Sequence, residues 1–225
     1  MSSYVPELSS IEGLKRIEEF DRDQMAGLCL EETHAVYPHQ QIYGKYCTIE
    51  EYINCPPEDV FQYLADGRSL EEWTWSTRDF VPTDEPGLMM GWDRLADDTK
   101  IYCRTISNAD AMTVDYHCAW DQGEHLWMIY LMRVVPAQLV LGKPGSVVLW
   151  SNCHHPNYDE NPYPWSVPEG RDTWVGQLWH FFYAGHVVEM QNLKKILEYR
   201  HATGQTIRPW HKSGGSESEK TMTFQ

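Results

Sequence analysis

The feature that most constrains the fold is a long helical run, Thr173 to about His201, that follows a series of strand-like segments. At about 100° per residue, one narrow stripe along this run collects Val175, Trp179, Phe182, His186, Leu193 and Leu197. Glu189 follows His186 by three residues and lies beside it on the helix. A closing helix that lays an aromatic stripe with a His–Glu pair across a sheet predicts a cavity as well as a core.

Composition limits the classes of partner. The 225 residues are enough for one large domain with extensions. The formal net charge of −15, from 33 acidic and 18 basic residues, argues against binding to nucleic acid or to anionic membrane surfaces. Ten Trp and 13 Tyr supply large side chains that can line a pocket for a small molecule, although any single one more often fills a core.

Cysteine spacing and hydropathy give no sign of a secreted or membrane-spanning protein. None of the six Cys forms a CxxC pair. The first 30 residues lack the apolar stretch of a signal peptide, and no apolar run approaches 18 residues. We therefore expect a cytoplasmic location and no membrane span.

The order of elements predicts an α+β fold with an antiparallel sheet. Residues 1–45 read as an N-terminal extension with one short helix, Ile11 to Phe20, followed by irregular chain. A strand at 46–53 and two short helices come next, and the tail from 204 to 225 reads as largely disordered. Strands are then expected at 75–81, 88–95, 99–106, 111–120, 126–136 and 145–153, separated by turn-like residues that favour a meander.

Strand alternation predicts which faces are covered. In 111–120 the even residues, from Met112 to Trp120, are apolar and should point inward. Strand 126–136 is apolar on both faces, which predicts a cover on each side, from the N-terminal extension or from a partner chain in a homodimer. Between the last strand and the helix, residues 154–172 carry four prolines and read as an ordered, lid-like loop.

Residues 47–66 (CTIEEYINCPPEDVFQYLAD) and Leu70-Glu-Glu-Trp73 carry a family resemblance. They are similar to the opening of the START-like (SRPBCC) superfamily, a strand, then A-P-x-x-V-[FW]-x-x-[LI]-x-D, then a Trp. The resemblance implies a helix-grip domain over about 46–203, in which a curved antiparallel sheet wraps a long helix around a hydrophobic cavity. Members of that superfamily include polyketide cyclases and lipid carriers, so the resemblance alone does not decide the function.

Three residues are candidates for catalysis. His186, on an otherwise apolar stripe, needs a hydrogen-bond partner, and Glu189 could orient it as a base or acid. Tyr130 could donate a hydrogen bond to a developing oxyanion. The plainer interpretation is a buried histidine that the backbone or Glu189 satisfies. Candidate ligand-binding residues are aromatic or soft side chains on the inward faces, together with one histidine after the last strand: Trp179, Phe182, Tyr116, Trp120, Met128, Trp150 and His154.

A metal site is a weaker alternative. His186 and Glu189 could join His154 or His117 in a set that suits iron or zinc, but no HxxxH or HExxH motif occurs. We therefore expect no metal and no other cofactor, with iron or zinc as the alternative. Three functions stay open: a cavity enzyme of secondary metabolism that cyclises or dehydrates a hydrophobic, polyketide-like substrate; a non-catalytic carrier of a hydrophobic ligand; and a metal-dependent enzyme on the same fold.

Overall fold

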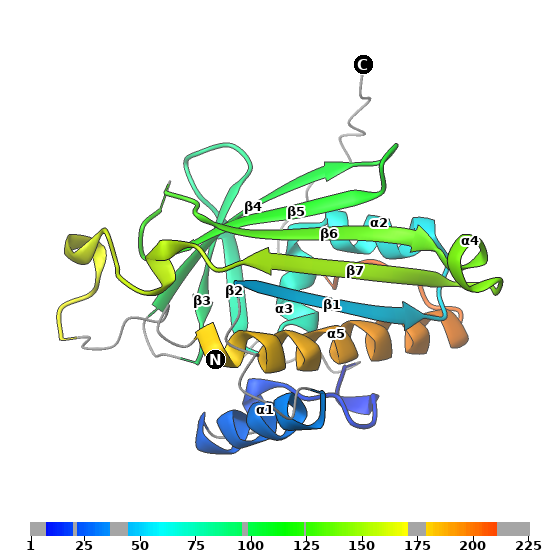
Figure 1. Ribbon diagram of the computed structural model, residues 1–225. Helices are drawn as coiled ribbons and strands as arrows, with labels where there is room; N and C mark the ends of the chain where they lie inside the picture. Colours follow the sequence, from blue (N-terminus) through cyan, green and yellow to red (C-terminus); the bar gives the residue numbers. More distant parts are fainter. Residues whose placement is uncertain are drawn as a thin grey trace.

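A computed structural model describes residues 8–19, 22–36, 45–95, 99–123, 125–170 and 179–210. These residues form one open antiparallel sheet and a long C-terminal helix, an α+β fold of the helix-grip type (Figure 1). The strand order across the sheet is β1-β7-β6-β5-β4-β3-β2. The predicted meander is thus confirmed, with the first strand added beside the last.

The strands lie where the alternation of the sequence predicts them. Their bounds are Tyr46–Ile53 (β1), Thr77–Pro82 (β2), Leu88–Asp93 (β3), Thr99–Asn108 (β4), Thr113–Trp120 (β5), Met128–Pro136 (β6) and Ser146–Cys153 (β7). On β5 the even residues Val114, Tyr116 and Cys118 are buried, as expected. A short helix between β6 and β7, α4 (Ala137–Leu141), was not predicted.

Helices cover one face of the sheet. Helix α5 (Trp179–Ala202) lies along β1, and helices α2 (Pro57–Ala65) and α3 (Leu70–Trp73) pack on the same inner side (Figure 1). Val60, Phe61 and Leu64 are among the buried side chains that dock α2, which matches the predicted opening motif. The residues from Thr173 to 178, where the sequence predicts the start of the long helix, lie outside the described residues.

The N-terminal extension differs from its prediction. Its α-helix, α1, is Arg22–Val36, whereas Ile11 to Phe20 contains a turn and a single 3-10 turn, Ile17–Glu19. Helix α1 packs against α5, on the side away from the sheet (Figure 1). Of the two covers expected for the outer face of β6, the described part of the extension is therefore not one, and Leu131 on that face is 45% exposed.

Two further segments pack against the rest of the domain. In the proline-rich loop, Tyr158 is 1% exposed and packs its ring against Trp120, Trp179 and Phe182. After α5 the chain turns back, and the Trp210 N–H donates to Glu72 Oε1. Residues 204–210 of the predicted disordered tail are thus ordered, and residues 211–225 lie outside the described residues.

Candidate active site

A cavity of about 310 Å³ lies between the inner face of the sheet and helices α1 and α5. Its lining is mostly apolar and includes the aromatic residues Trp73, Trp75, Phe80, Tyr116, Trp120, Tyr130, Trp150, Phe181 and Phe182. Mostly apolar concave sites with a few polar groups are typical of small-molecule binding. The few polar groups of this cavity decide its chemistry.

Helix α5 presents its polar groups to the cavity from one face. Phe182, Gly185, His186 and Glu189 all line it, at the three- and four-residue spacing of a single helical face. Gly185 allows the indole ring of Trp75 to approach helix α5 closely, because a Cβ at that position would lie 3.3 Å from Nε1 of Trp75. The glycine in the middle of the helix is explained by this packing.

Glu189 is a buried acid. It is 7% exposed, and its Oε1 accepts a hydrogen bond from the Trp75 backbone N–H at 3.3 Å. Burial, with a smaller contribution from the charge of Asp93, raises the pKa of Glu189 to about 8, against the opposing effects of the Trp75 N–H and Arg78. At neutral pH the Glu189 carboxyl is therefore mostly protonated and can act as a proton donor.

Asp93, the last residue of β3, is a site residue that the sequence prediction missed. It lines the cavity, is 6% exposed and accepts a hydrogen bond from the Leu95 N–H at 3.0 Å. Burial raises the pKa of Asp93, while the Leu95 N–H, Ser76, Trp120 and Arg78 oppose that rise. The signal in the sequence was its alternation with Gly91, which places the acid on the inward face of its strand.

His186 lines the same cavity as Glu189. It is 6% exposed, and its Nδ1 lies 3.6 Å from Sγ of Cys47. Its ring packs against Trp150 at 4.3 Å and against the edge of Tyr130 at 5.5 Å. Burial lowers the pKa of His186 to about 3, so the imidazole is neutral at pH 7. Among the described contacts, Nδ1 of His186 lies by Cys47 and Oε1 of Glu189 accepts from the Trp75 N–H, and the orienting pair stays a prediction.

Four of the other predicted site residues lie close together on the sheet side. Tyr116, Trp120, Tyr130 and Trp150 line the cavity, and Tyr116 and Tyr130 are directly opposite one another on β5 and β6. The Tyr116 hydroxyl donates to the Leu64 carbonyl at 2.6 Å and is thus already satisfied. Burial raises the pKa of Tyr130 well above its ordinary value, so its hydroxyl keeps its proton and can donate it in a hydrogen bond.

Phe182 also lines the cavity, but three predicted ligand contacts do not. Met128 is fully buried in the core beneath Tyr130. Trp179 stacks on the ring of His154, with centroids 4.7 Å apart, and His154 Nε2 lies 3.2 Å from a carboxylate oxygen of Asp159. The sequence could not identify the inward face of β6, because both faces of 126–136 are apolar.

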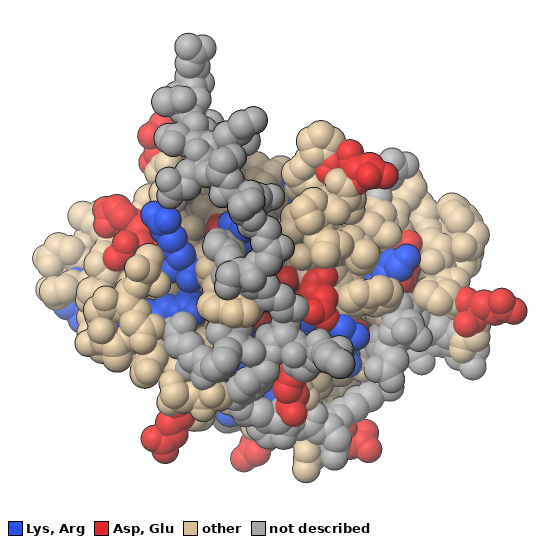
Figure 2. Space-filling model, turned by 180° about the vertical axis from the view of Figure 1, so that it is seen from behind, with Lys and Arg blue, Asp and Glu red and all other residues tan. Residues whose placement is uncertain are grey.

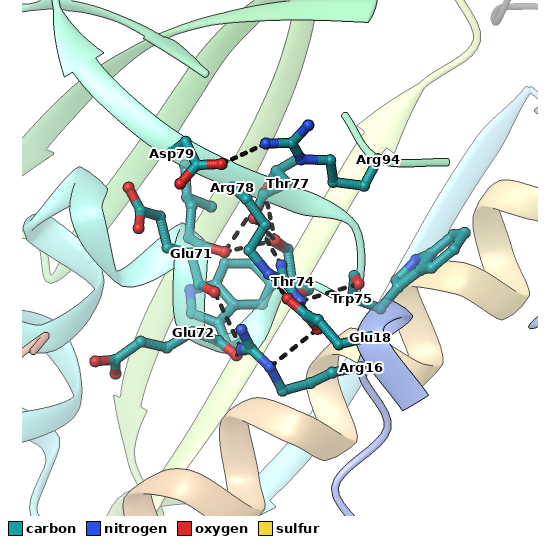
Figure 3. A network of polar contacts seen from close by, with 12 residues as sticks. Arg16, Glu18, Glu71, Glu72, Thr74, Trp75, Thr77, Arg78, Asp79 and Arg94 are labelled. Atoms are coloured by element: carbon teal, nitrogen blue, oxygen red, sulfur yellow. Dashed lines mark hydrogen bonds and ion pairs between the residues drawn. The ribbon is translucent and has the colours of Figure 1, made fainter. Parts of the chain in front are cut away.

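The N-terminal extension closes one side of the site. Ala26 and Cys29 of α1 line the cavity, and residues 16–18 dock on the loop that follows α3 (Figure 3). The Ile17 N–H donates to the Trp75 carbonyl at 2.9 Å, and Arg16, 1% exposed, donates to the carbonyls of Glu71 and Glu72. The extension is thereby part of the cavity wall.

Arg78, beside the cavity, is held by a bulge. The pairing of β2 with β3 shifts register between Arg78 and Val81, and Asp79 takes a positive φ of 58°, which Asp tolerates better than most residues. The guanidinium of Arg78 is 2% exposed and donates to both carboxylate oxygens of Glu18. This ion pair joins the extension to the rim of the cavity (Figure 3).

The predicted metal set is not brought together. Within the described residues there is no group of three or more His, Cys, Asp or Glu side chains that could hold a metal ion. His154 lies with Asp159 outside the cavity lining, and His117 belongs to the odd, less buried face of β5.

None of the described helices is long and apolar enough to cross a membrane. The face in Figure 2 carries acidic and basic side chains interspersed.

Comparisons with known proteins find similar chains but identify no function. A family model described as a domain of unknown function (DUF8713) matches residues 45–150, slightly less than half of the chain. No curated protein matches. Among solved structures, the KanY protein is 14% identical, with a TM-score of 0.45 and coverage of 69% of this chain and 99% of that one.

Two further solved structures show the same range of similarity. The Aha1 dimer from Colwellia psychrerythraea is 13% identical, with a TM-score of 0.45 over 68% of this chain and 96% of that one. DynU16, a protein of the dynemicin biosynthetic locus, is 12% identical, with a TM-score of 0.42 over 75% of this chain and 51% of that one.

Proposed function

We propose that this chain is an enzyme of small-molecule, secondary metabolism that binds a hydrophobic, polyketide-like substrate in the cavity and promotes a cyclisation or dehydration by proton transfer. The observation that carries the proposal is the position of Glu189. Its carboxyl lies in an aromatic, water-poor cavity and has a pKa of about 8, close to the pH at which a general acid or base works best.

The two predicted catalytic partners of Glu189 take supporting roles. A neutral imidazole with a pKa of about 3 is a weak base, so His186 hydrogen-bonds the substrate and does not remove its proton. Tyr130, which keeps its phenolic proton, donates a hydrogen bond to an oxygen on which negative charge develops. In a dehydration, Glu189 gives its proton to the departing hydroxyl, which leaves as water, and then regains a proton from the neighbouring carbon.

Proton exchange tests the proposal without the natural substrate. The aromatic ketone 2-tetralone is incubated with the protein in D₂O, and deuterium at the carbon next to its carbonyl is followed by NMR. We expect the protein to accelerate exchange, with a rate that rises through a pH of about 8 as Glu189 ionises. Glu189→Gln should lower the rate by about 100-fold or more, the usual size of a general-base contribution.

The control is Glu198→Gln, which removes a carboxylate from the same helix outside the cavity lining. It should leave the exchange rate unchanged. His186→Ala should weaken exchange less than Glu189→Gln does. An exchange rate that is the same in the native protein and in Glu189→Gln contradicts the proposal.

A non-catalytic carrier is the second candidate. It is favoured by the largely apolar lining and by the hydroxyl of Tyr116, which is already bonded to the Leu64 carbonyl. Native mass spectrometry of the purified protein addresses it. A co-purified hydrophobic molecule, together with no Glu189-dependent proton exchange, would favour the carrier.

A further inference from the structure

The cavity lining contains acidic side chains but no Lys or Arg among the described residues. The two carboxyl groups that line it are those of Asp93 and Glu189. A ligand that enters the cavity therefore meets two acids on one side. Whether it also meets a positive charge depends on Arg78 and His186, the two neighbouring groups that could carry one.

Arg78 has no donor left for a ligand. A guanidinium has five N–H donors. Nε and Nη2 donate to Glu18 at 2.7 and 3.0 Å, Nη2 also donates to the Trp75 carbonyl at 3.1 Å, and Nη1 donates to the carbonyls of Thr74 and Thr77 at 2.9 and 2.6 Å (Figure 3). All five donors are used within the protein, so Arg78 cannot grip a carboxylate or phosphate in the cavity.

His186 does not supply a positive charge either, because burial lowers its pKa to about 3. The buried charges behind the cavity also leave Glu189 without a cation of its own. The positive charges of Arg16 and Arg78 both lie against the carboxylate of Glu18, at 3.5 and 2.7 Å. Asp93 raises the pKa of Glu189, so ionisation of Glu189 would place a negative charge near another acid in a buried site.

The aromatic lining also favours a positively charged ligand. The faces of Trp and Tyr rings attract cations, most strongly where water is excluded. An uncharged ligand would gain from the rings as hydrophobic surface only, and an anion would meet the two acids with no donor to hold it. A cation gains from the rings and from a carboxylate together.

We propose that the ligand of this cavity is a hydrophobic molecule with a protonated amine, whose ammonium group lies between Glu189 and the aromatic rings. This inference rests on the proposed function in using the same cavity and the same carboxyl group. It adds the substrate class. With an ammonium ligand bound, Glu189 is ionised, so the order of the two proton transfers is reversed: Glu189 first takes the proton from the neighbouring carbon and then gives it to the departing hydroxyl, which leaves as water.

Binding should then release a proton. The groups that act on Glu189 are the Trp75 N–H, Asp93 and Arg78, and its own charge reaches Cys29, Cys47 and Tyr130. None of these except Arg78 is positive, so an arriving ammonium is the group that stabilises the Glu189 carboxylate. At neutral pH each bound amine should displace up to about one proton from the protein.

Isothermal titration calorimetry with three matched probes tests the proposal. 2-(2-Naphthyl)ethylamine, 2-(2-naphthyl)ethanol and 3-(2-naphthyl)propionate share one ring system and differ in charge. We expect the amine to bind at least about tenfold more tightly than the alcohol, the usual scale of a charge-assisted hydrogen bond, and the propionate to bind most weakly. Titration in two buffers of different ionisation enthalpy should show proton release for the amine and none for the alcohol.

Substitutions test which side chain causes the preference for the amine and the proton release. Glu189→Gln should remove the preference for the amine and its proton release while leaving the affinity for the alcohol within about twofold, which also shows that the variant is folded. Asp93→Asn should weaken the preference to a smaller extent. Glu198→Gln, on the same helix but outside the cavity lining, should change none of these quantities.

The outcomes separate this inference from the proposed function. Equal binding of amine and alcohol, or a preference that persists in Glu189→Gln, overturns the ammonium site and leaves the proton-exchange result standing. Preference for the amine without any catalysed exchange keeps the ligand class and removes the enzyme. No binding by any of the three probes overturns the ammonium proposal as well.

Discussion

Glu18 and Arg78, sixty positions apart in the sequence, form a bidentate ion pair at the rim of the cavity, with oxygen–nitrogen distances of 2.7 and 3.0 Å. Burial alone would raise the pKa of Glu18, but Arg78 and Arg16 outweigh burial and lower it to about 2. The pair anchors the N-terminal extension and uses donors of Arg78 that would otherwise face a ligand.

Glu18→Gln should destabilise the fold. Arg78 is 2% exposed and would keep its charge without the carboxylate that balances it, a change that costs about 3 kcal/mol of the free energy of unfolding at pH 7. Urea unfolding followed by circular dichroism measures the difference. Glu12→Gln, at an exposed position of the same extension, is the control and should change stability by less than about 0.5 kcal/mol. A loss as small as that of the control contradicts the anchoring role.

His186 should make the protein sensitive to mild acid. Its folded pKa of about 3 lies below the ordinary 6.5, so the folded state binds this proton less readily than the unfolded state does. The stability that the neutral imidazole contributes to the fold is fully present above pH 6.5 and is lost as pH falls from 6.5 towards 3. His186→Gln should therefore lose less stability than the native protein between pH 7 and pH 5, by roughly 1–2 kcal/mol. The exposed His201→Gln serves as the control and should follow the native curve.

The sheet and its closing helix could be predicted because their signals are local. Alternation in β5 identifies its inward face, and the Pro-Pro-Glu-Asp start of α2 identifies a helix. The position of α1 could not be predicted in this way. Arg22–Val36 has hardly any amphipathic pattern. Among the apolar side chains described in this helix, only Met25 and Cys29 are buried.

The candidate site was predicted in part for a related reason. His186 and Glu189 stand out on an apolar stripe, so one helix is enough to find them. Their partners come from other elements: Asp93 from β3, Cys47 from β1 and the Trp75 N–H from the loop before β2. Helical spacing predicted a His–Glu contact, but tertiary packing turned each side chain to a different neighbour.

Two glycines should respond in opposite ways to alanine. A Cβ at Gly91 would lie 2.8 Å from the Arg78 carbonyl oxygen and 3.0 Å from the ring of Phe80, so the strand must shift. Gly91→Ala should therefore destabilise the protein by about 1–3 kcal/mol. Gly27 lies within α1 with nothing within 4 Å, and Gly27→Ala should stabilise by up to about 1 kcal/mol. Thermal unfolding of both variants measures this, and a stable Gly91→Ala would contradict the close packing of β2 on β3.

Glu189 should make the protein less stable as pH rises, in contrast to an ordinary surface acid. Its folded pKa of about 8 lies above the ordinary 4.5, so the folded state holds this proton more tightly than the unfolded state. The stabilising proton is fully effective below about pH 4.5 and is lost as pH rises through 8. Between pH 6 and pH 9 the free energy of unfolding of the native protein should fall by a few kcal/mol relative to that of Glu189→Gln. Urea unfolding across that range, with Glu198→Gln as the matched control, makes the comparison. Parallel pH profiles for the native protein and Glu189→Gln would mean that the carboxyl is ionised at neutral pH, and the general-acid role would then be lost.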